Sequence, residues 1–223
     1  MNNKRLIIIS ILILAIAIIG KLIFIMAKNI KPDEFHKSAI IFVVDSSASN
    51  QKMLPEEIKY LKSLCSILDP EDAIKILKVS ENSYLIYEGS PSDSIGITKA
   101  VEAFTKYDEK DYGTAYGEGL KKAFEHCLTM KKNGYIPSIV VIGDLENEGA
   151  IEKQINWETL PENVKSIQKY IPEISMMFVY AHPEKLDSVK TNLNPILGEK
   201  KLIIANEQNV QKAQRRFLEA IGR

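Results

Sequence analysis

Short, uninterrupted apolar runs alternate with stretches of helical periodicity along most of this chain. The run at residues 39–44 ends at Asp45, and the run at residues 136–143 ends at Asp144. Apolar, β-branched runs of this length are typical of strands that are buried on both faces of a parallel sheet. Because such a sheet needs helices between its strands, the pattern predicts an α/β fold.

The remaining strands and helices follow from the same changes of period. Residues 73–79 alternate in polarity and residues 84–87 follow a turn, so together they predict a hairpin at the sheet edge. Further strands are expected at 174–181 and 201–205, and helices at 55–68, 97–105, 115–131, 163–170, 183–193 and 207–221. Right-handed crossovers then predict a doubly wound, mostly parallel six-stranded sheet of order 3-2-1-4-5-6. Strand 3 is expected to be an antiparallel edge strand, with helices on both faces of the sheet.

The winding of such a sheet reverses between strands 1 and 4. Ligands of doubly wound sheets bind beyond the carboxyl ends of the strands at that point. Asp45 ends strand 1 and Asp144 ends strand 4. We therefore expect these two carboxylates to lie side by side at the ligand-binding edge, although 99 positions separate them in the sequence.

The N-terminal segment predicts a membrane anchor. Residues 6–27 are apolar except for Ser10 and Lys21. This length of helix spans the hydrocarbon core of a bilayer, and Lys21 lies close enough to one end to reach the headgroups. The alternative, a cleaved signal peptide, requires small residues at positions −1 and −3 of the cut, but a cut after Ala27 puts Ile25 at −3. We therefore predict that residues 1–27 are an uncleaved transmembrane helix.

Residues 28–37, which contain Pro32 and several charges, predict a short linker. Residues 38–223 then predict a single domain, long enough to bury a core. Lys4 and Arg5 precede the anchor, and a short basic head before a long exported domain usually stays in the cytoplasm. We expect a single-pass membrane protein whose N-terminus is cytoplasmic and whose domain is periplasmic or extracellular.

Composition narrows the kinds of partner. The predicted domain carries 23 Lys and Arg residues against 27 Asp and Glu residues. Because affinity for a phosphate backbone comes from clustered Lys and Arg, nucleic acid is not an expected partner. The two cysteines, Cys65 and Cys127, lack zinc-ligand spacing. Each lies on the inward stripe of a different helix, and these helices are expected on opposite faces of the sheet, so we predict two free, buried thiols.

Three motifs follow one another in the predicted domain. The first is DSSAS at residues 45–49, directly after the first strand, a pattern that alone is also typical of a polar loop capping a helix. The second is GTAYGEGL at 113–120, and the third is SIVVIGDLENEG at 138–149. Together they resemble the von Willebrand factor type A family, which includes the integrin inserted domains, over about residues 38–222. The family's D-x-S-x-S and G-T-x-x-G-x-x-L patterns are present, whereas its usual T-D-G has Gly143 for Thr and Leu145 for Gly.

This resemblance implies a metal-ion-dependent adhesion site. Ser47, Ser49 and Thr114 would ligate the cation through their hydroxyls, and Asp45 and Asp144 would do so directly or through water. Such oxygens are hard ligands that suit Mg²⁺, Mn²⁺ or Ca²⁺ better than zinc, and Mg²⁺ is the expected ion. In this family the cation captures an Asp or Glu of a protein partner, so the expected function is cation-dependent protein binding rather than catalysis.

Aromatic residues suggest where a partner would make contact. Trp157, Tyr112 and Tyr116 are expected at the metal face, and aromatic side chains are frequent in binding hot spots. For Trp157 the alternative is packing against its own loop.

Two further functions stay open. One is an assembly scaffold whose metal site is vestigial or structural, which the altered residues at 143 and 145 suggest. The other is a Mg²⁺-dependent hydrolase that uses Asp45 or Asp144. The chain lacks a Ser/His/Asp order, a nucleophile elbow and a Gly-rich phosphate loop, which disfavours the hydrolase.

Overall fold

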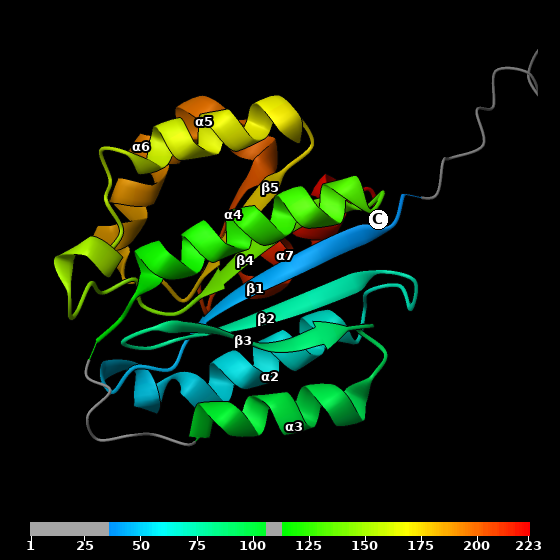
Figure 1. Ribbon diagram of the computed structural model, residues 1–223, viewed down its shortest axis with the longest axis horizontal. Coiled ribbons are helices and arrows are strands. Elements are labelled where there is room, and N and C mark those ends of the chain that lie inside the picture. Colours follow the sequence, from blue (N-terminus) through cyan, green and yellow to red (C-terminus); the bar gives the residue numbers. More distant parts are fainter. Residues whose placement is uncertain (1–35, 106–112) are drawn as a thin grey trace, which may run out of the picture. The chain divides into compact units, whose positions relative to one another are not determined.

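Strand β1 lies inside a six-stranded mixed sheet of order β3-β2-β1-β4-β5-β6, which confirms the predicted strand order (Figure 1). The computed structural model describes residues 36–105 and 113–223. The strands are β1 (Ser38–Asp45), β2 (Ala73–Val79), β3 (Ser83–Gly89), β4 (Ile136–Ile142), β5 (Ser175–Val179) and β6 (Leu202–Ala205). β1 pairs in parallel with both β2 and β4, and β3 runs antiparallel to β2 at the edge, as predicted.

The side chains of β1 divide between the two faces of the sheet. All eight residues of the strand are buried. Ile41 and Val43 belong to the hydrophobic cluster on one face, and Ile40 and Phe42 belong to the cluster on the other. Because successive residues of a strand point to opposite faces, a strand covered on both sides must be apolar at every position. This explains why the sequence shows a continuous run here rather than an alternating one.

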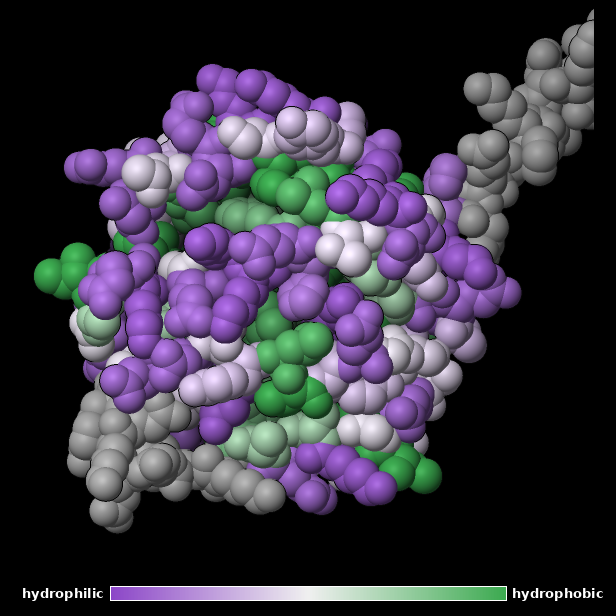
Figure 2. All heavy atoms as spheres, viewed as in Figure 1, coloured by the Kyte–Doolittle hydropathy of each residue, from purple (hydrophilic) through white to green (hydrophobic). Residues whose placement is uncertain are grey.

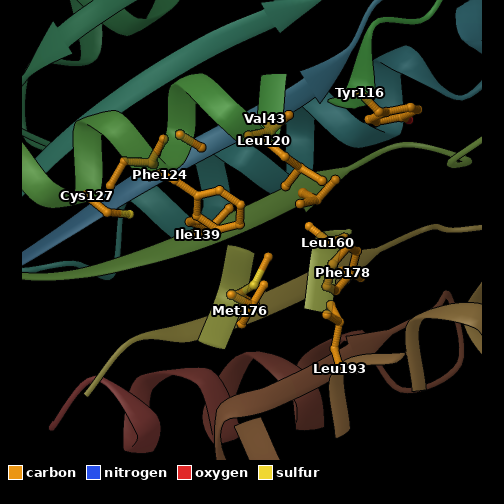
Figure 3. Packing of buried hydrophobic residues seen from close by; sticks show 14 of the residues in the cluster. Val43, Tyr116, Leu120, Phe124, Cys127, Ile139, Leu160, Met176, Phe178 and Leu193 are labelled. Carbon is orange, nitrogen blue, oxygen red and sulfur yellow. The ribbon is translucent and has the colours of Figure 1, made fainter. Parts of the chain in front are cut away.

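Helices cover both faces. They are α2 (Leu54–Cys65), α3 (Ser94–Thr105), α4 (Tyr116–Lys132), α5 (Leu160–Tyr170), α6 (Pro183–Lys201) and α7 (Val210–Ala220), with short 3-10 turns η1 (Ser49–Lys52) and η2 (Ile151–Lys153). α4, α5 and α6 contribute to one cluster, and α2, α3 and α7 contribute to the other. In Figure 3, Leu120 and Phe124 of α4 lie over Val43 and Ile139 of the sheet. Each large apolar side chain that is fully buried in this way contributes about 1.5–3 kcal/mol.

Helix α6 is longer than the sequence predicts. We expected it to end before Pro195, but the helix continues through Pro195 until Gly198, whose non-helical φ of 70° and ψ of 167° make a kink before the last residues up to Lys201. A proline inside a helix removes one backbone hydrogen bond and disfavours the helical conformation. Leu193 and Leu197, on either side of it, are both buried in the core. Packing against the sheet therefore outweighs the local preference of Pro195.

The two cysteines are free and buried, as predicted. Cys65 of α2 and Cys127 of α4 belong to the clusters on opposite faces, so the sheet separates them. Burial raises the pKa of the Cys65 thiol to about 12 and raises the pKa of Cys127 as well. Both side chains are therefore protonated core residues at neutral pH.

The surface is hollowed between α4 and α5. Figure 2 shows apolar side chains there, between more hydrophilic ones. The groove has a volume of about 640 Å³, and its apolar lining includes Leu120, Phe124 and Leu128 of α4 together with Leu160 and Ile167 of α5. The five predicted metal ligands do not line it, so this groove is separate from the predicted cation site.

The predicted membrane anchor lies outside the described residues, as does most of the linker at 28–37. Within the described segments, 36–105 and 113–223, no helix is long and apolar enough to cross a membrane. The anchor and its orientation therefore stay predictions from the sequence.

Candidate metal centre

Asp45 and Asp144 lie at the carboxyl edge of neighbouring parallel strands. Asp45 is the last residue of β1, and Asp144 follows the end of β4 by two positions. Val44 pairs with Ile142, so the two strands end side by side. Burial, together with the nearby charge of Asp144, raises the pKa of Asp45. The topology thus brings the two carboxylates into the same local environment.

The five residues that begin at Asp45 form a loop held by its own hydrogen bonds. The N–H of Ser47 donates to Oδ1 of Asp45 at 2.7 Å, and the hydroxyl oxygens of Ser47 and Ser49 are 3.1 Å apart. Ser46 instead turns to β2, where its N–H and its hydroxyl both donate to the carbonyl of Val79, at 2.7 and 3.1 Å. Asp45, Ser47 and Ser49 therefore form one connected polar cluster, from which Ser46 is turned away.

Thr114 comes from the segment that precedes α4. Its side chain is fully buried, and its hydroxyl oxygen has no hydrogen-bond partner among the described residues. Its N–H donates to the carbonyl of Glu148 at 2.9 Å, in the loop that follows Asp144. A Cβ at Gly149 would come within 3.0 Å of the Cα of Gly113, so these two loops touch backbone to backbone. A buried hydroxyl without a partner costs about 1–3 kcal/mol, and a cation would remove that cost.

Tyr116 corrects one of our predictions. The sequence places it among the contacts for a partner, but its side chain is fully buried. Its hydroxyl donates to Oδ2 of Asp45 at 2.8 Å and accepts a hydrogen bond from the N–H of Leu145 at 3.2 Å. The ring belongs to the buried hydrophobic cluster and its hydroxyl is hydrogen-bonded within the protein, so this side chain is not exposed to a partner.

The structure explains the departure from T-D-G at position 143 and shows the backbone conformation at position 145. A Cβ at Gly143 would overlap the Tyr116 hydroxyl and would lie 2.5 Å from the Cβ of Asp45, so a threonine does not fit there. Leu145 has φ 63°, in the left-handed region that glycine favours. The chain therefore keeps a glycine-like backbone at position 145 even though the residue is leucine.

The carboxylate of Asp144 is held by its own loop. Its Oδ1 accepts a hydrogen bond from the N–H of Glu146 at 2.8 Å, and its carbonyl accepts one from the N–H of His182 at 2.9 Å. Glu146 in turn forms an ion pair with Lys185, with the nitrogen and oxygen 3.1 Å apart. These contacts connect the loop after β4 to the start of α6.

The other predicted partner contacts have different outcomes. Trp157 is half-buried and packs against the hydrophobic cluster to which α4 contributes. Its role in binding a partner stays a prediction. Tyr112 lies outside the described residues.

Glu57 and Asn50 belong to this region but were not singled out from the sequence. Both are buried, and the side-chain amide of Asn50 donates to Oε2 of Glu57 at 2.7 Å and to the carbonyl of Asp45 at 3.3 Å. Glu57 lies four residues before Leu61, on the inward stripe of α2. That spacing was the available signal, and an acid on an apolar stripe is unusual enough to indicate a buried charged or protonated group.

Two buried carboxyl groups of the cluster have raised pKa values. Burial raises the pKa of Asp45 to about 7 and the pKa of Glu57 to about 9. Asp144 raises the pKa of Asp45 further, while hydrogen bonds from Ser47 and Tyr116 lower it. Crowded carboxylates repel one another, and a positive ion beside them would relieve that repulsion.

The available donors fit a hard divalent cation. Within the described part of the chain, no three His, Cys, Asp or Glu side chains gather in a way that could hold a metal. A cation beside Asp45 would therefore also need hydroxyl ligands, for which Ser47, Ser49 and Thr114 are the candidates. This set of oxygen donors suits Mg²⁺, as the resemblance implies.

Replacing Glu57 with Gln is expected to stabilise the protein at neutral and higher pH. The pKa of Glu57 is about 9 in the folded protein and near 4.5 when unperturbed, so the unfolded chain loses this proton first and stability falls as the pH rises between those values. Glu57→Gln keeps an oxygen for Asn50 and removes the titration. We expect a gain on the order of 2–3 kcal/mol at pH 7 and none near pH 4.5, measured by urea unfolding.

The exposed neighbour Glu56 provides the control for this experiment. Glu56→Gln is expected to change the free energy of unfolding by less than about 0.5 kcal/mol at every pH. If Glu57→Gln and the wild type lost stability in parallel between pH 5 and 9, the pKa assigned to Glu57 would be wrong.

The fold is similar to that of several solved structures. No protein-family model matches the sequence, and no curated protein matches it either. BatB from Bacteroides thetaiotaomicron is similar with a TM-score of 0.58 and 17% identity, over 82% of this chain and 98% of that one. A von Willebrand factor type A protein from Catenulispora acidiphila is similar with a TM-score of 0.55 and 13% identity, over 84% of this chain and 43% of that one.

A third similar structure contains a metal. It is proximal thread matrix protein 1 from the mussel byssus with a zinc-occupied MIDAS motif, with a TM-score of 0.54 and 12% identity, over 83% of this chain and 48% of that one. The chain thus spans nearly all of BatB and about half the length of the other two proteins. At identities this low, structural similarity shows the fold alone. The chain has the fold of von Willebrand factor type A domains.

Proposed function

We propose that this protein is a membrane-tethered docking domain that binds a divalent cation and, through it, an acidic residue of a protein partner. The observation that carries the proposal is the buried Thr114 hydroxyl, which has no hydrogen-bond partner among the residues that the structure describes and lies in a loop that contacts the one following Asp144. Beside that loop, Asp45, Ser47 and Ser49 form a connected set of oxygen donors. Unpaired buried polar atoms are rare in folded proteins, and they call for an explanation such as a bound ion.

Each residue of the cluster has its own part in the proposal. The hydroxyls of Ser47, Ser49 and Thr114 would hold the cation as neutral ligands, and Asp45 and Asp144 would balance its charge. With so few carboxylates, a bound Mg²⁺ would keep enough positive character to accept a carboxylate oxygen from a partner. The zinc in the MIDAS motif of the mussel protein supports a divalent cation in general, and our preference for Mg²⁺ rests on the hard oxygen donors.

Protein binding is favoured over catalysis. The names of the three similar structures describe a matrix protein, a von Willebrand factor type A protein and BatB, none of them an enzyme by name. Asp45, which a hydrolase would use as nucleophile or base, already accepts hydrogen bonds from Ser47 and Tyr116. Because a nucleophile must reach its substrate, a fully buried Asp45 suits charge balance better than attack.

Mg²⁺ is expected to raise the thermal stability of the protein. A ligand that binds only the folded state raises stability with the logarithm of its saturation, so Mg²⁺ at 100 times its dissociation constant should raise the melting temperature by roughly 5–10 °C over EDTA. We expect Asp45→Ala and Ser47→Ala to abolish this rise. Ser46→Ala is the matched control, because its hydroxyl faces Val79, and it should keep the rise. A wild type that melts at one temperature with Mg²⁺ and with EDTA would contradict cation binding.

An assembly scaffold with a vestigial or structural metal site is the second candidate. It is favoured by the Tyr116 hydroxyl, which already satisfies one carboxylate oxygen of Asp45 from within the protein. Pull-down from solubilised membranes, with Mg²⁺ or with EDTA, distinguishes the two functions. For a docking domain, EDTA and Ser47→Ala should each release the same partner, while Ser46→Ala retains it. Partners that stay bound in EDTA would support the scaffold.

The membrane tether is proposed from residues 6–27, with the domain outside the cytoplasm. Protease treatment of intact spheroplasts should therefore digest residues 38–223, as followed by an antibody against the domain. A cytoplasmic protein should stay intact in the same sample as the control. A domain that is protected until the cells are lysed would reverse the proposed orientation.

A further inference from the structure

One oxygen atom connects two parts of the candidate site that come from different strands. The hydroxyl of Tyr116 donates to Oδ2 of Asp45 at the end of β1, at 2.8 Å. The same oxygen accepts a hydrogen bond from the N–H of Leu145, at 3.2 Å, in the loop after β4. Tyr116 itself is the first residue of α4 and is fully buried. It therefore joins one predicted ligand, Asp45, to the backbone beside the other, Asp144.

The backbone at Leu145 needs such support. Its φ of 63° lies in a region that residues other than glycine rarely adopt. Its side chain is buried in the cluster beneath α4, and its N–H is held by Tyr116. A strained conformation persists only where its surroundings hold it in place. Because Asp144 directly precedes Leu145, relaxation of this φ would move the Asp144 carboxylate.

Gly143 provides the space that the Tyr116 hydroxyl occupies. A Cβ at this position would overlap that oxygen and would approach the Cβ of Asp45 to 2.5 Å. Gly143 also has φ 141°, a conformation that side chains disfavour. The Tyr116 hydroxyl therefore fits only because residue 143 has no side chain. Together, Gly143 and Tyr116 set how closely the loop after β1 and the loop after β4 approach each other.

We propose that Tyr116 is a positioning residue for the cation site, which holds Asp45 and the Asp144 loop in their binding arrangement through its hydroxyl and does not ligate the ion. This inference rests on the proposed function, because it requires a cation at the site. Hydrogen-bond partners of metal ligands commonly change metal affinity by about 10–100-fold when they are removed. A residue outside the D-x-S-x-S motif would then also influence cation affinity.

Tyr116→Phe tests the proposal by removing the hydroxyl and keeping the ring. In the full chain in detergent micelles, calorimetric titration with MgCl₂ should give a dissociation constant at least about tenfold above that of the wild type. Tyr60→Phe is the matched control, because Tyr60 is also buried and its hydroxyl contacts the sulfur of Met177, within the cluster on the opposite face. Tyr60→Phe is expected to lose stability and to bind Mg²⁺ like the wild type. Wild-type affinity in a folded Tyr116→Phe would overturn the proposal.

A second variant, Leu145→Gly, tests whether the Tyr116 hydroxyl acts by holding the backbone at position 145. Glycine adopts φ 63° without strain, so the loop no longer needs the hydroxyl to hold it. We expect Tyr116→Phe to weaken Mg²⁺ binding less when Leu145→Gly is also present. The change in the logarithm of the dissociation constant should then be less than half the change that Tyr116→Phe causes in the wild type. An equal loss in both backgrounds would overturn positioning through Leu145. A wild type that does not bind Mg²⁺ would overturn the proposed function as well, whereas equal binding by wild type and Tyr116→Phe overturns this inference alone.

Discussion

The candidate site depends on one buried carboxylate at the end of a central strand. Asp45 is fully buried, and each of its side-chain oxygens has a donor, the N–H of Ser47 on one side and the hydroxyl of Tyr116 on the other. Without such donors a buried charge is very costly. The loop after β1, the start of α4 and the loop after β4 must therefore all be placed correctly for Asp45 to be accommodated. Even so, burial and Asp144 raise its pKa to about 7.

Parallel topology is what brings these segments together. β2, β1 and β4 all end at one edge of the sheet. There the N–H of Ser46 donates to the carbonyl of Val79 at the end of β2, and the N–H of Ala115, directly before α4, donates to the carbonyl of Ser80. The helices then cover the two faces and leave that edge to the polar loops (Figure 1). The same fold occurs in two solved structures that are 17% and 13% identical to this chain.

The departures from the usual motif form one connected set. Gly143 leaves room for the hydroxyl of Tyr116, and that hydroxyl supports Leu145 in a glycine-like conformation. Considered separately, the absence of Thr at position 143 and of Gly at position 145 suggests a vestigial metal site. Taken together with Tyr116, they form a hydrogen-bonded connection between the end of β1 and the loop after β4. Asp45, Ser47 and Ser49 match the D-x-S-x-S pattern and are joined by hydrogen bonds.

The sequence by itself determined the sheet order and the edge at which Asp45 and Asp144 meet, because burial on both faces demands apolar runs and parallel strands end together. It also placed Cys65 and Cys127 on opposite faces, since helical periodicity shows which side of a helix is buried. Only the tertiary structure decided that α6 continues past Pro195 and that Tyr116 turns inward to an acid 71 positions away. Local periodicity carries no information about such contacts, because they depend on which side chains meet once the helices have packed against the sheet.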